Sequence, residues 1–324
     1  MREVRYTEAV REALQEEMRR DERVIVLGTH VRTAIANGGI TAGLLEEFGP
    51  ERVMDTPVAE AALAGIAAGA AVAGYRPFIV IGSLGYALSL MDQVCNQAAK
   101  MHYTTDGEIS VPVTYWFETS YRGWGVHHAQ AIHALWCHLP GLKVAMPSLA
   151  SDAKGLTKAA LRDDNPVAVI AHPNLFGTTS VISDSEQLME LGTAKIVRQG
   201  SDITLVACGW FMQRALEAAE KLAVEGVSAE VLDLRSLVPL DWATLTASAE
   251  ATGRVIVYDQ GHRSCGIAVT VAAGIQERAF RSLKAPVVVV ATADVPIPFN
   301  LALEDRVVPT VDNLVQAAKA CLSY

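Results

Sequence analysis

Short apolar runs alternate along the chain with longer segments of helical character. The apolar runs predict buried strands at residues 24–27, 78–82, 111–117, 142–146, 166–171, 203–209, 228–234, 254–261 and 286–291. Helices are predicted at residues 58–74, 86–101, 148–162, 211–224, 266–281 and 312–321. This alternation is typical of parallel sheets covered by helices, an α/β fold.

One stretch breaks the alternation. Residues 172–192 are rich in polar and turn-forming residues and have no clear period. The chain has 324 residues, which at about 150 residues per domain corresponds to two domains. We therefore predict two doubly wound α/β domains, residues 1–175 and 193–324, joined by a linker at residues 176–192.

Composition and charge exclude several classes of protein. Lys and Arg number 27 against 36 Asp and Glu, a net charge of −9, and no basic run stands out, so we expect no nucleic-acid partner. The five cysteines form no C-x-x-C pair, which argues against a disulfide framework or zinc knuckle and fits a cytoplasmic location. The charged N-terminus does not resemble a signal peptide. Arg76 and Pro77 divide the apolar stretch at residues 61–91 into pieces too short to span a membrane, so no membrane association is expected.

Several common catalytic motifs are absent. The sequence has no complete G-x-G-x-x-G, no G-x-x-x-x-G-K-[ST] and no G-x-S-x-G. Ser151 and Lys154 match S-x-x-K, but inside a predicted helix and without its companion motifs. The histidines at 128, 133 and 138 are five residues apart, which separates neighbours by about 140° on a helix and does not favour a metal cluster.

Glu60 is the one charged residue between Pro57 and Tyr75. Thr56 is predicted to be the N-cap of a helix whose first residue is Pro57. Two interpretations of Glu60 stay open at this point. An acidic residue in the first turn of a helix is favoured by the helix dipole. A carboxylate among small apolar neighbours is expected to be buried and suited to proton exchange.

A combination of motifs points to one family. They are Asp55-Thr-Pro-Val-Ala-Glu60, Met91-Asp-Gln-Val, Pro140-Gly-Leu-Lys-Val, Asp152-Ala-Lys-Gly, Arg162-Asp-Asp-Asn-Pro-Val and Ala293-Asp-Val-Pro-Ile-Pro. They resemble the β subunits of the thiamine-diphosphate-dependent decarboxylating component of 2-oxo acid dehydrogenases, of the pyruvate, branched-chain and acetoin types. The resemblance covers nearly the whole chain. It implies a transketolase-like pyrimidine-binding domain followed by a transketolase C-terminal domain.

The resemblance also implies an activity and roles for single residues. The enzyme would be an oxidoreductase that decarboxylates a 2-oxo acid and passes the acyl group to a lipoyl carrier. Glu60 matches the family glutamate that hydrogen-bonds N1′ of the cofactor aminopyrimidine, where proton exchange activates the cofactor. Tyr86 matches the position of an aromatic residue packed against the aminopyrimidine. His128 matches the histidine of the family's H-S-Q motif, which faces the substrate and acts in acyl transfer.

Metal sites and partners follow from the same resemblance. Val113, Leu161, Asp163 and Asn165 match a structural potassium site of some members, whose ligands are largely backbone carbonyls. The G-D-G and Asn-Asn motif that holds Mg²⁺ and diphosphate in thiamine-diphosphate enzymes is missing here. The resemblance therefore implies an α subunit that carries Mg²⁺ and the diphosphate, an α2β2 heterotetramer that shares the cofactor between α and β, and a lipoyl acyltransferase core as a further partner.

Three departures from the family pattern keep an alternative open. Residues 116–125 replace an R-G-P-x-G-type segment with one residue fewer, residues 79–83 lack the usual acidic or aromatic residues, and Ala129 replaces the serine of H-S-Q. These changes lie around the expected pocket. The alternative is a subunit of a split transketolase-like or acyloin-forming carboligase, which would pass the thiamine-bound unit to an aldehyde.

Overall fold

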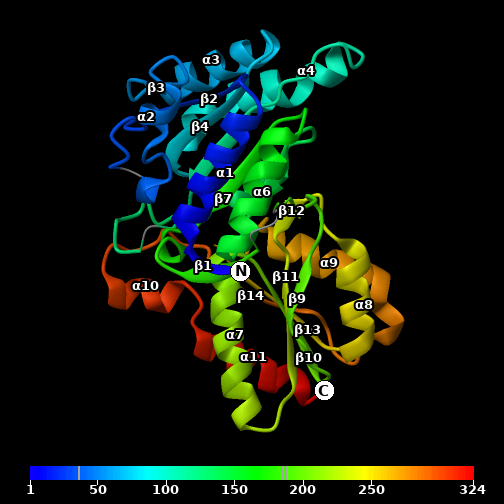
Figure 1. The fold of residues 1–324 in the computed structure, drawn as a ribbon. Coiled ribbons are helices and arrows are strands. Elements are labelled where there is room, and N and C mark those ends of the chain that lie inside the picture. The colour runs from blue at the N-terminus through cyan, green and yellow to red at the C-terminus, as the bar shows by residue number, and fades with distance from the viewer. Residues whose placement is uncertain (36, 121, 184–185, 187) are drawn as a thin grey trace. The chain divides into compact units, whose positions relative to one another are not determined.

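The computed structural model describes residues 1–35, 37–120, 122–183, 186 and 188–324. The chain divides into two compact units, which are residues 1–121 with 135–191, and residues 122–134 with 192–324 (Figure 1). Residues 184, 185 and 187 of the predicted linker and residue 121 of the divergent 116–125 segment lie outside the described residues.

The first unit contains a parallel sheet in the order β6-β7-β5-β4-β2-β3. Its strands are β2 (Val24–Gly28), β3 (Val53–Asp55), β4 (Arg76–Ser83), β5 (Thr114–Glu118), β6 (Lys143–Ala145) and β7 (Val167–Ala171). Every residue of β2, β5 and β7 is buried, as is usual for central strands of a parallel sheet, which are covered on both faces. This double burial explains why consecutive apolar residues, rather than alternating ones, predicted these strands correctly.

An antiparallel pair and six helical segments complete this part of the chain. β1 (Arg2–Arg5) pairs with β8 (Thr179–Ile182), inside the stretch where no element was predicted. The α-helices are α1 (Tyr6–Arg20), α2 (Leu44–Phe48), α3 (Glu60–Val72), α4 (Ala99–Thr104), α5 (His133–Cys137) and α6 (Ala150–Arg162). Helix α1 was not predicted either. It packs along α6 and buries one side that includes Val10, Leu14 and Met18.

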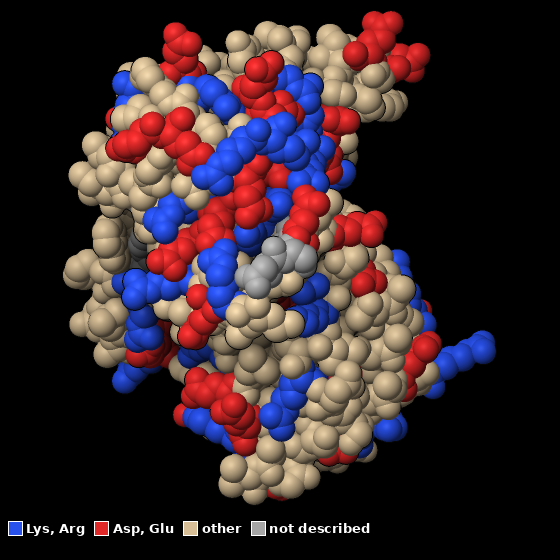
Figure 2. Space-filling view, in the orientation of Figure 1, with Lys and Arg blue, Asp and Glu red and all other residues tan. Residues whose placement is uncertain are grey.

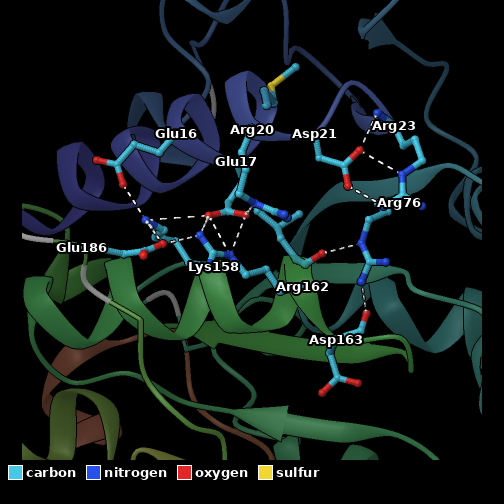
Figure 3. Close-up of polar contacts among 12 residues, drawn as sticks. Glu16, Glu17, Arg20, Asp21, Arg23, Arg76, Lys158, Arg162, Asp163 and Glu186 are labelled. Atoms are coloured by element: carbon cyan, nitrogen blue, oxygen red, sulfur yellow. Dashed lines mark hydrogen bonds and ion pairs between the residues drawn. The ribbon is translucent and has the colours of Figure 1, made fainter.

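Ion pairs reinforce the contact between α1 and α6 (Figure 3). The Glu17 carboxylate on α1 is fully buried and accepts hydrogen bonds from Arg20 Nε at 2.7 Å and Arg162 Nη2 at 2.8 Å. Lys158 Nζ, also buried, lies 2.7 Å from Glu16 Oε2 and 3.7 Å from Glu17 Oε1. Figure 2 shows the result as interleaved acidic and basic side chains across this face. Because acidic side chains are paired with basic ones, the network holds α1 on α6 without making this surface strongly positive or strongly negative.

Two predicted helices differ from the observed ones. Helix α3 begins at Glu60 after Ala59, which forms no side-chain cap, so the prediction that Thr56 caps the helix and Pro57 opens it is wrong. Thr56 N–H donates to the carbonyl of Gly28 at 3.0 Å, which holds the chain against the end of β2 and delays the helix. The predicted helix at 86–101 is broken into a 3-10 segment η2 (Tyr86–Leu90), a π-helical segment η3 (Gln93–Ala98) and α4.

The second unit contains a sheet in the order β14-β13-β10-β11-β9, parallel except for β9. Its strands are β9 (Lys195–Arg198), β10 (Ile203–Ala207), β11 (Ala229–Asp233), β13 (Val255–His262) and β14 (Val288–Thr292); β12 (Ser236–Val238) follows β11. Its helices are α7 (Gly209–Val224), α8 (Trp242–Thr252), α9 (Ile267–Ala279), α10 (Leu301–Val307) and α11 (Val311–Leu322). Helix α7 packs with α11, and α8 packs with α9, so that both faces of this sheet are covered (Figure 1).

Among the described residues, no helix is both long and apolar enough to cross a membrane.

Candidate functional site

The carboxyl ends of three neighbouring parallel strands, β3, β2 and β4, lie at one edge of the sheet in the first unit. Strand β2 lies between β3 and β4, so the chain reverses its direction of travel across the sheet at β2. In open α/β sheets, ligands bind outside the carboxyl ends of strands at such a switch point. A Cβ atom at Gly28, the last residue of β2, would lie 2.5 Å from the carbonyl oxygen of Val80. A glycine is therefore required where β2 and β4 meet at this edge.

Glu60 and Tyr86 follow the two strands that flank β2. The chain leaves β3 at Asp55, whose Oδ1 accepts the N–H of Arg32 at 2.9 Å, and reaches Glu60 at the first turn of α3. It leaves β4 at Ser83 and reaches Tyr86 at the start of η2. Helix α3 packs against η2, so the structure brings these two predicted cofactor residues into neighbouring elements. Glu60 is half-buried rather than buried, and the Tyr86 ring is 46% exposed.

This pair of side chains fits the aminopyrimidine half of thiamine diphosphate. A half-buried carboxylate at a helix start can exchange a proton with a ring nitrogen, and an exposed aromatic face can stack on a planar heterocycle.

Glu118 at the carboxyl end of β5 was not predicted as a functional residue. Its side chain is fully buried, and Oε2 has no hydrogen-bond partner among the described residues. Trp116 Nε1 donates to Oε1 at 3.5 Å. Burial raises the pKa of Glu118 to about 8, because the Trp116 contact only partly offsets the loss of water. Strand β5 lies next to β4, so a carboxyl group that is mainly protonated at neutral pH sits at the same edge of the sheet.

His128 lies in the second unit, in the turn-rich segment from Arg122 to Ala134. Its ring meets Trp124 edge-on, with 6.2 Å between the ring centroids. The neighbouring Val126, His127 and Gln130 line a cavity of about 450 Å³, together with residues of the C-terminal half: His262, Asp294, Val295, Pro296 and Ile297. Sequence reasoning selected His128 but missed His127 and His262, which give this cavity two imidazole groups.

Two carbonyl groups of the predicted potassium site already have a cationic partner. Arg76, which is buried, donates from Nε to Leu161 O at 2.7 Å and from Nη2 to Asp163 O at 2.6 Å (Figure 3). The carbonyl of Val113 accepts from the Val167 amide, and Asn165 bonds the Asp163 side chain. A monovalent cation placed there would meet the guanidinium, so the residues present do not fit it. The potassium site stays a prediction that this geometry does not favour.

Among the residues that the structure describes, no cluster of three or more His, Cys, Asp or Glu side chains could hold a metal ion.

Comparison with known proteins decides the family. Residues 2–178 match the pyrimidine-binding domain of transketolase, and residues 192–314 match the transketolase C-terminal domain. A rice mitochondrial pyruvate dehydrogenase E1 component subunit beta-2 is 41% identical over 99% of this chain and 87% of its own length. The Rickettsia bellii pyruvate dehydrogenase E1 component subunit beta is 39% identical over 96% of both chains. The chain belongs to the family of pyruvate dehydrogenase E1 β subunits.

Membership of this E1 β family confirms the predicted resemblance and fold class. The activity class is confirmed as well: the protein is a β subunit of a thiamine-diphosphate-dependent 2-oxo acid dehydrogenase, an oxidoreductase. A solved structure described as a split-gene transketolase, an inactive beta4 tetramer, superposes with a TM-score of 0.79 at 27% identity, covering 99% of this chain and 98% of the other. The roles of Glu60, Tyr86 and His128 stay predictions, as does the cytoplasmic location, since several plant relatives are named as mitochondrial.

Proposed function

We propose that this E1 β chain supplies the aminopyrimidine half of a thiamine-diphosphate site that a separate α subunit completes. The α subunit would hold Mg²⁺ and the diphosphate, in an α2β2 assembly that delivers acyl groups to the lipoyl groups of an acyltransferase core. The observation that carries the proposal is the position of Glu60, at the exposed end of an apolar helix whose outer side has no cover in the described chain.

Glu60 is the proton-exchanging group of this site. When bound, thiamine diphosphate supplies the carbon nucleophile and the electron sink for decarboxylation. The Glu60 carboxyl donates a proton to N1′ of the aminopyrimidine and takes it back, and a group in this role contributes roughly 10²–10⁴-fold to a rate. Tyr86 would hold the aminopyrimidine by stacking on it, beside Glu60.

The outer side of α3 supports the need for a partner chain. No charged residue follows Glu60 in this helix, and Ile66 is 58% and Val72 46% exposed. Val58 before the helix and Tyr75 after it are exposed as well. Exposed apolar groups that lie together on one helix are typical of a protein interface. A partner seated on this side would also enclose Glu60, which accounts for a half-buried carboxylate in the isolated chain.

His128 is the acyl-transfer residue of the proposal. Its imidazole lies beside Trp124 in a segment whose neighbouring residues line the cavity of the second unit. An imidazole can donate a proton to a sulfur or oxygen atom of the acceptor and recover it within one turnover.

Reconstitution with the α subunit tests the proposal. The chain is co-expressed with the α subunit, and a panel of 2-oxo acids is assayed for transfer to a lipoyl domain and to small aldehydes. Acylation of the lipoyl domain by one class of 2-oxo acid is expected. Transfer only to aldehydes would replace the dehydrogenase proposal by a carboligase, and activity of this chain without an α subunit would overturn the shared site.

A further inference from the structure

The segment from Arg122 to Ala134 groups with the C-terminal unit, although the sequence on both sides of it, residues 1–121 and 135–191, forms the first unit. The segment consists largely of turns, with glycines at 123 and 125 in the left-handed region of φ. The backbone N–H groups of His128 and Ala129 both donate hydrogen bonds to the carbonyl of Gly125. With so little internal secondary structure, the position of the segment depends on what holds its two ends.

A buried carboxylate holds the beginning of the segment. Glu304, in the short helix α10, is 5% exposed, and its Oε2 accepts the backbone N–H of Gly123 at 3.1 Å. Burial raises the pKa of Glu304, and the Gly123 N–H and the Arg122 guanidinium oppose that rise. The backbone at Gly123 has φ +73°, and a Cβ atom there would lie 3.0 Å from Leu301 Cδ2, so the segment lies directly against α10.

A buried ion pair holds the end of the segment. His133 Nε2 lies 3.2 Å from Asp259 Oδ2 on β13, and the two residues are 0% and 4% exposed. Burial alone would lower the pKa of His133, but the Asp259 carboxylate outweighs it and raises the pKa. A Cβ atom at Gly261 would lie 2.8 Å from Asp259 Oδ2 and 3.1 Å from His133 Cε1. The absence of a side chain at Gly261 therefore leaves the space that this pair occupies.

We propose that Glu304 and the His133–Asp259 pair are positioning residues that clamp the histidine segment from both ends and so fix His128 for acyl transfer. The role of His128 rests on the proposed function, whereas the clamp itself rests only on the contacts above. Helix α10 and strand β13, which hold residues 122–134, are remote from them in sequence. The C-terminal unit therefore sets the geometry of a segment that belongs in sequence to the first half of the chain.

The clamp has a functional consequence because acyl transfer depends on placement. A displacement of about 1 Å in a reacting group can cost on the order of 100-fold in rate. Loss of the Glu304 carboxylate frees the Gly123 amide and the turn that leads to His128. Decarboxylation, with Glu60 as its proton-exchanging group, should suffer less than transfer to the lipoyl group.

Three variants of the assembled α/β complex test the clamp. Glu304→Ala removes the acceptor for Gly123 N–H, and Glu304→Gln keeps an oxygen acceptor of the same length. Asp305→Ala is the control for a surface tie to the same helix, because in the described part of the chain Asp305 forms an exposed pair with Arg122 of the segment, and such pairs contribute little. The first readout is hydrogen–deuterium exchange of peptides that cover residues 122–134. The second is the ratio of two rates with the same 2-oxo acid: acylation of a lipoyl domain, and oxidation by ferricyanide.

We expect at least about tenfold faster exchange in Glu304→Ala and a transfer-to-oxidation ratio lowered by about 10- to 100-fold. Glu304→Gln and Asp305→Ala should keep the wild-type exchange and ratio. Wild-type exchange in Glu304→Ala would overturn the clamp. So would equal losses of both rates, because general destabilisation leaves the ratio unchanged. If the exchange rises as expected but His128→Ala transfers acyl groups normally, the clamp stands and the assignment of His128 fails.

A second pair of variants covers the case in which Glu304→Ala does not assemble. His133→Gln keeps an N–H donor near the position of Nε2, and His133→Leu removes it. Faster exchange at residues 122–134 and a lowered ratio in His133→Leu, both restored in His133→Gln, support the clamp. Identical behaviour of the two variants contradicts it.

Discussion

Replacement of Glu118 by Gln should make the protein increasingly stable relative to the wild type as pH rises. Glu118 is fully buried, and burial raises its pKa from 4.5 to about 8. Below pH 4.5 the carboxyl is protonated in both the folded and the unfolded chain, so its titration has no effect on stability. Between these two pKa values the unfolded chain releases the proton and the folded chain keeps it. The free energy of unfolding therefore falls as pH rises through this window and levels off above about pH 8.

The magnitude follows from the same two values. One pKa unit corresponds to about 1.4 kcal/mol, so at pH 7 the retained proton costs about 3 kcal/mol of stability. Glu118→Gln has the same size and cannot ionise. Its stability relative to the wild type should rise by about 3 kcal/mol between pH 4.5 and pH 7, whatever the Gln side chain itself contributes.

Urea unfolding of the purified chain at pH 4.5, 6, 7 and 8 measures this difference. Thr114→Val is the matched control, since Thr114 is also buried on β5 but does not titrate. Its effect on stability should not change with pH. A stability difference between Glu118→Gln and wild type that is constant from pH 4.5 to 8 would refute the reasoning, and would mean that Glu118 is ionised in the folded chain.

Three further predictions concern the helix pair, the histidine and the isolated chain. Glu17→Gln removes the buried countercharge of Arg162 and should lower the free energy of unfolding, measured in urea titrations, by about 3 kcal/mol. The control Arg19→Ala breaks an exposed pair with Glu47 and should lower it by less than about 1 kcal/mol. In the α/β complex, His128→Ala should slow acylation of a lipoyl domain by about 10²–10⁴-fold with little change in cofactor affinity; normal transfer would remove His128 from the mechanism. If this chain supplies only the aminopyrimidine half, as we propose, it should bind thiamine diphosphate weakly in Mg²⁺ when alone, and micromolar 1:1 binding by calorimetry would contradict a shared site.

Much of the fold could be predicted because burial leaves a simple pattern. Strands such as β2 and β7 are covered on both faces, so each is a short run of apolar residues that a sequence reveals directly. Helix α1 has an equally clear helical period, yet its charges were used only to exclude a signal peptide. Three of those charges, Glu12, Glu16 and Glu17, form ion pairs with basic residues of α6. A buried ion network makes a core helix look like a surface helix in sequence.

The start of α3 shows a limit of local rules. Thr56 followed by Pro57 has the composition of a helix start. The hydrogen bond from Thr56 N–H to Gly28 O, a residue on another strand, keeps the chain extended until Glu60. A contact between residues 28 positions apart cannot be inferred from the capping pattern. Glu60 was placed correctly in the first turn of the helix, although the residue that opens the helix was not.

Sequence motifs point to single candidate side chains, but they do not reveal contacts between distant residues. Glu60 and His128 were proposed from motifs and Tyr86 from its position in the family pattern, and their roles stay predictions. The attachment of residues 122–134 to α10 and β13 depends on Glu304 and Asp259, which are more than 120 positions away from their partners. Glu118 had a visible signal, an acidic residue at the end of the apolar run 114–117, but only its burial shows that the group is unusual.

The central claim is that Glu60 exchanges a proton with a cofactor that a partner chain completes. The most direct test is the rate at which the thiazolium C2 proton of bound thiamine diphosphate exchanges with deuterium, measured in the assembled α/β complex for wild type and Glu60→Gln. The amide keeps the size of the side chain and can still hydrogen-bond N1′, but it cannot pass a proton. The account predicts unchanged assembly and an exchange rate lowered on the order of 100-fold or more. Wild-type exchange in Glu60→Gln, with only a small drop in melting temperature, would contradict the account. Glu60 would then be an acidic residue whose only role is its favourable interaction with the helix dipole.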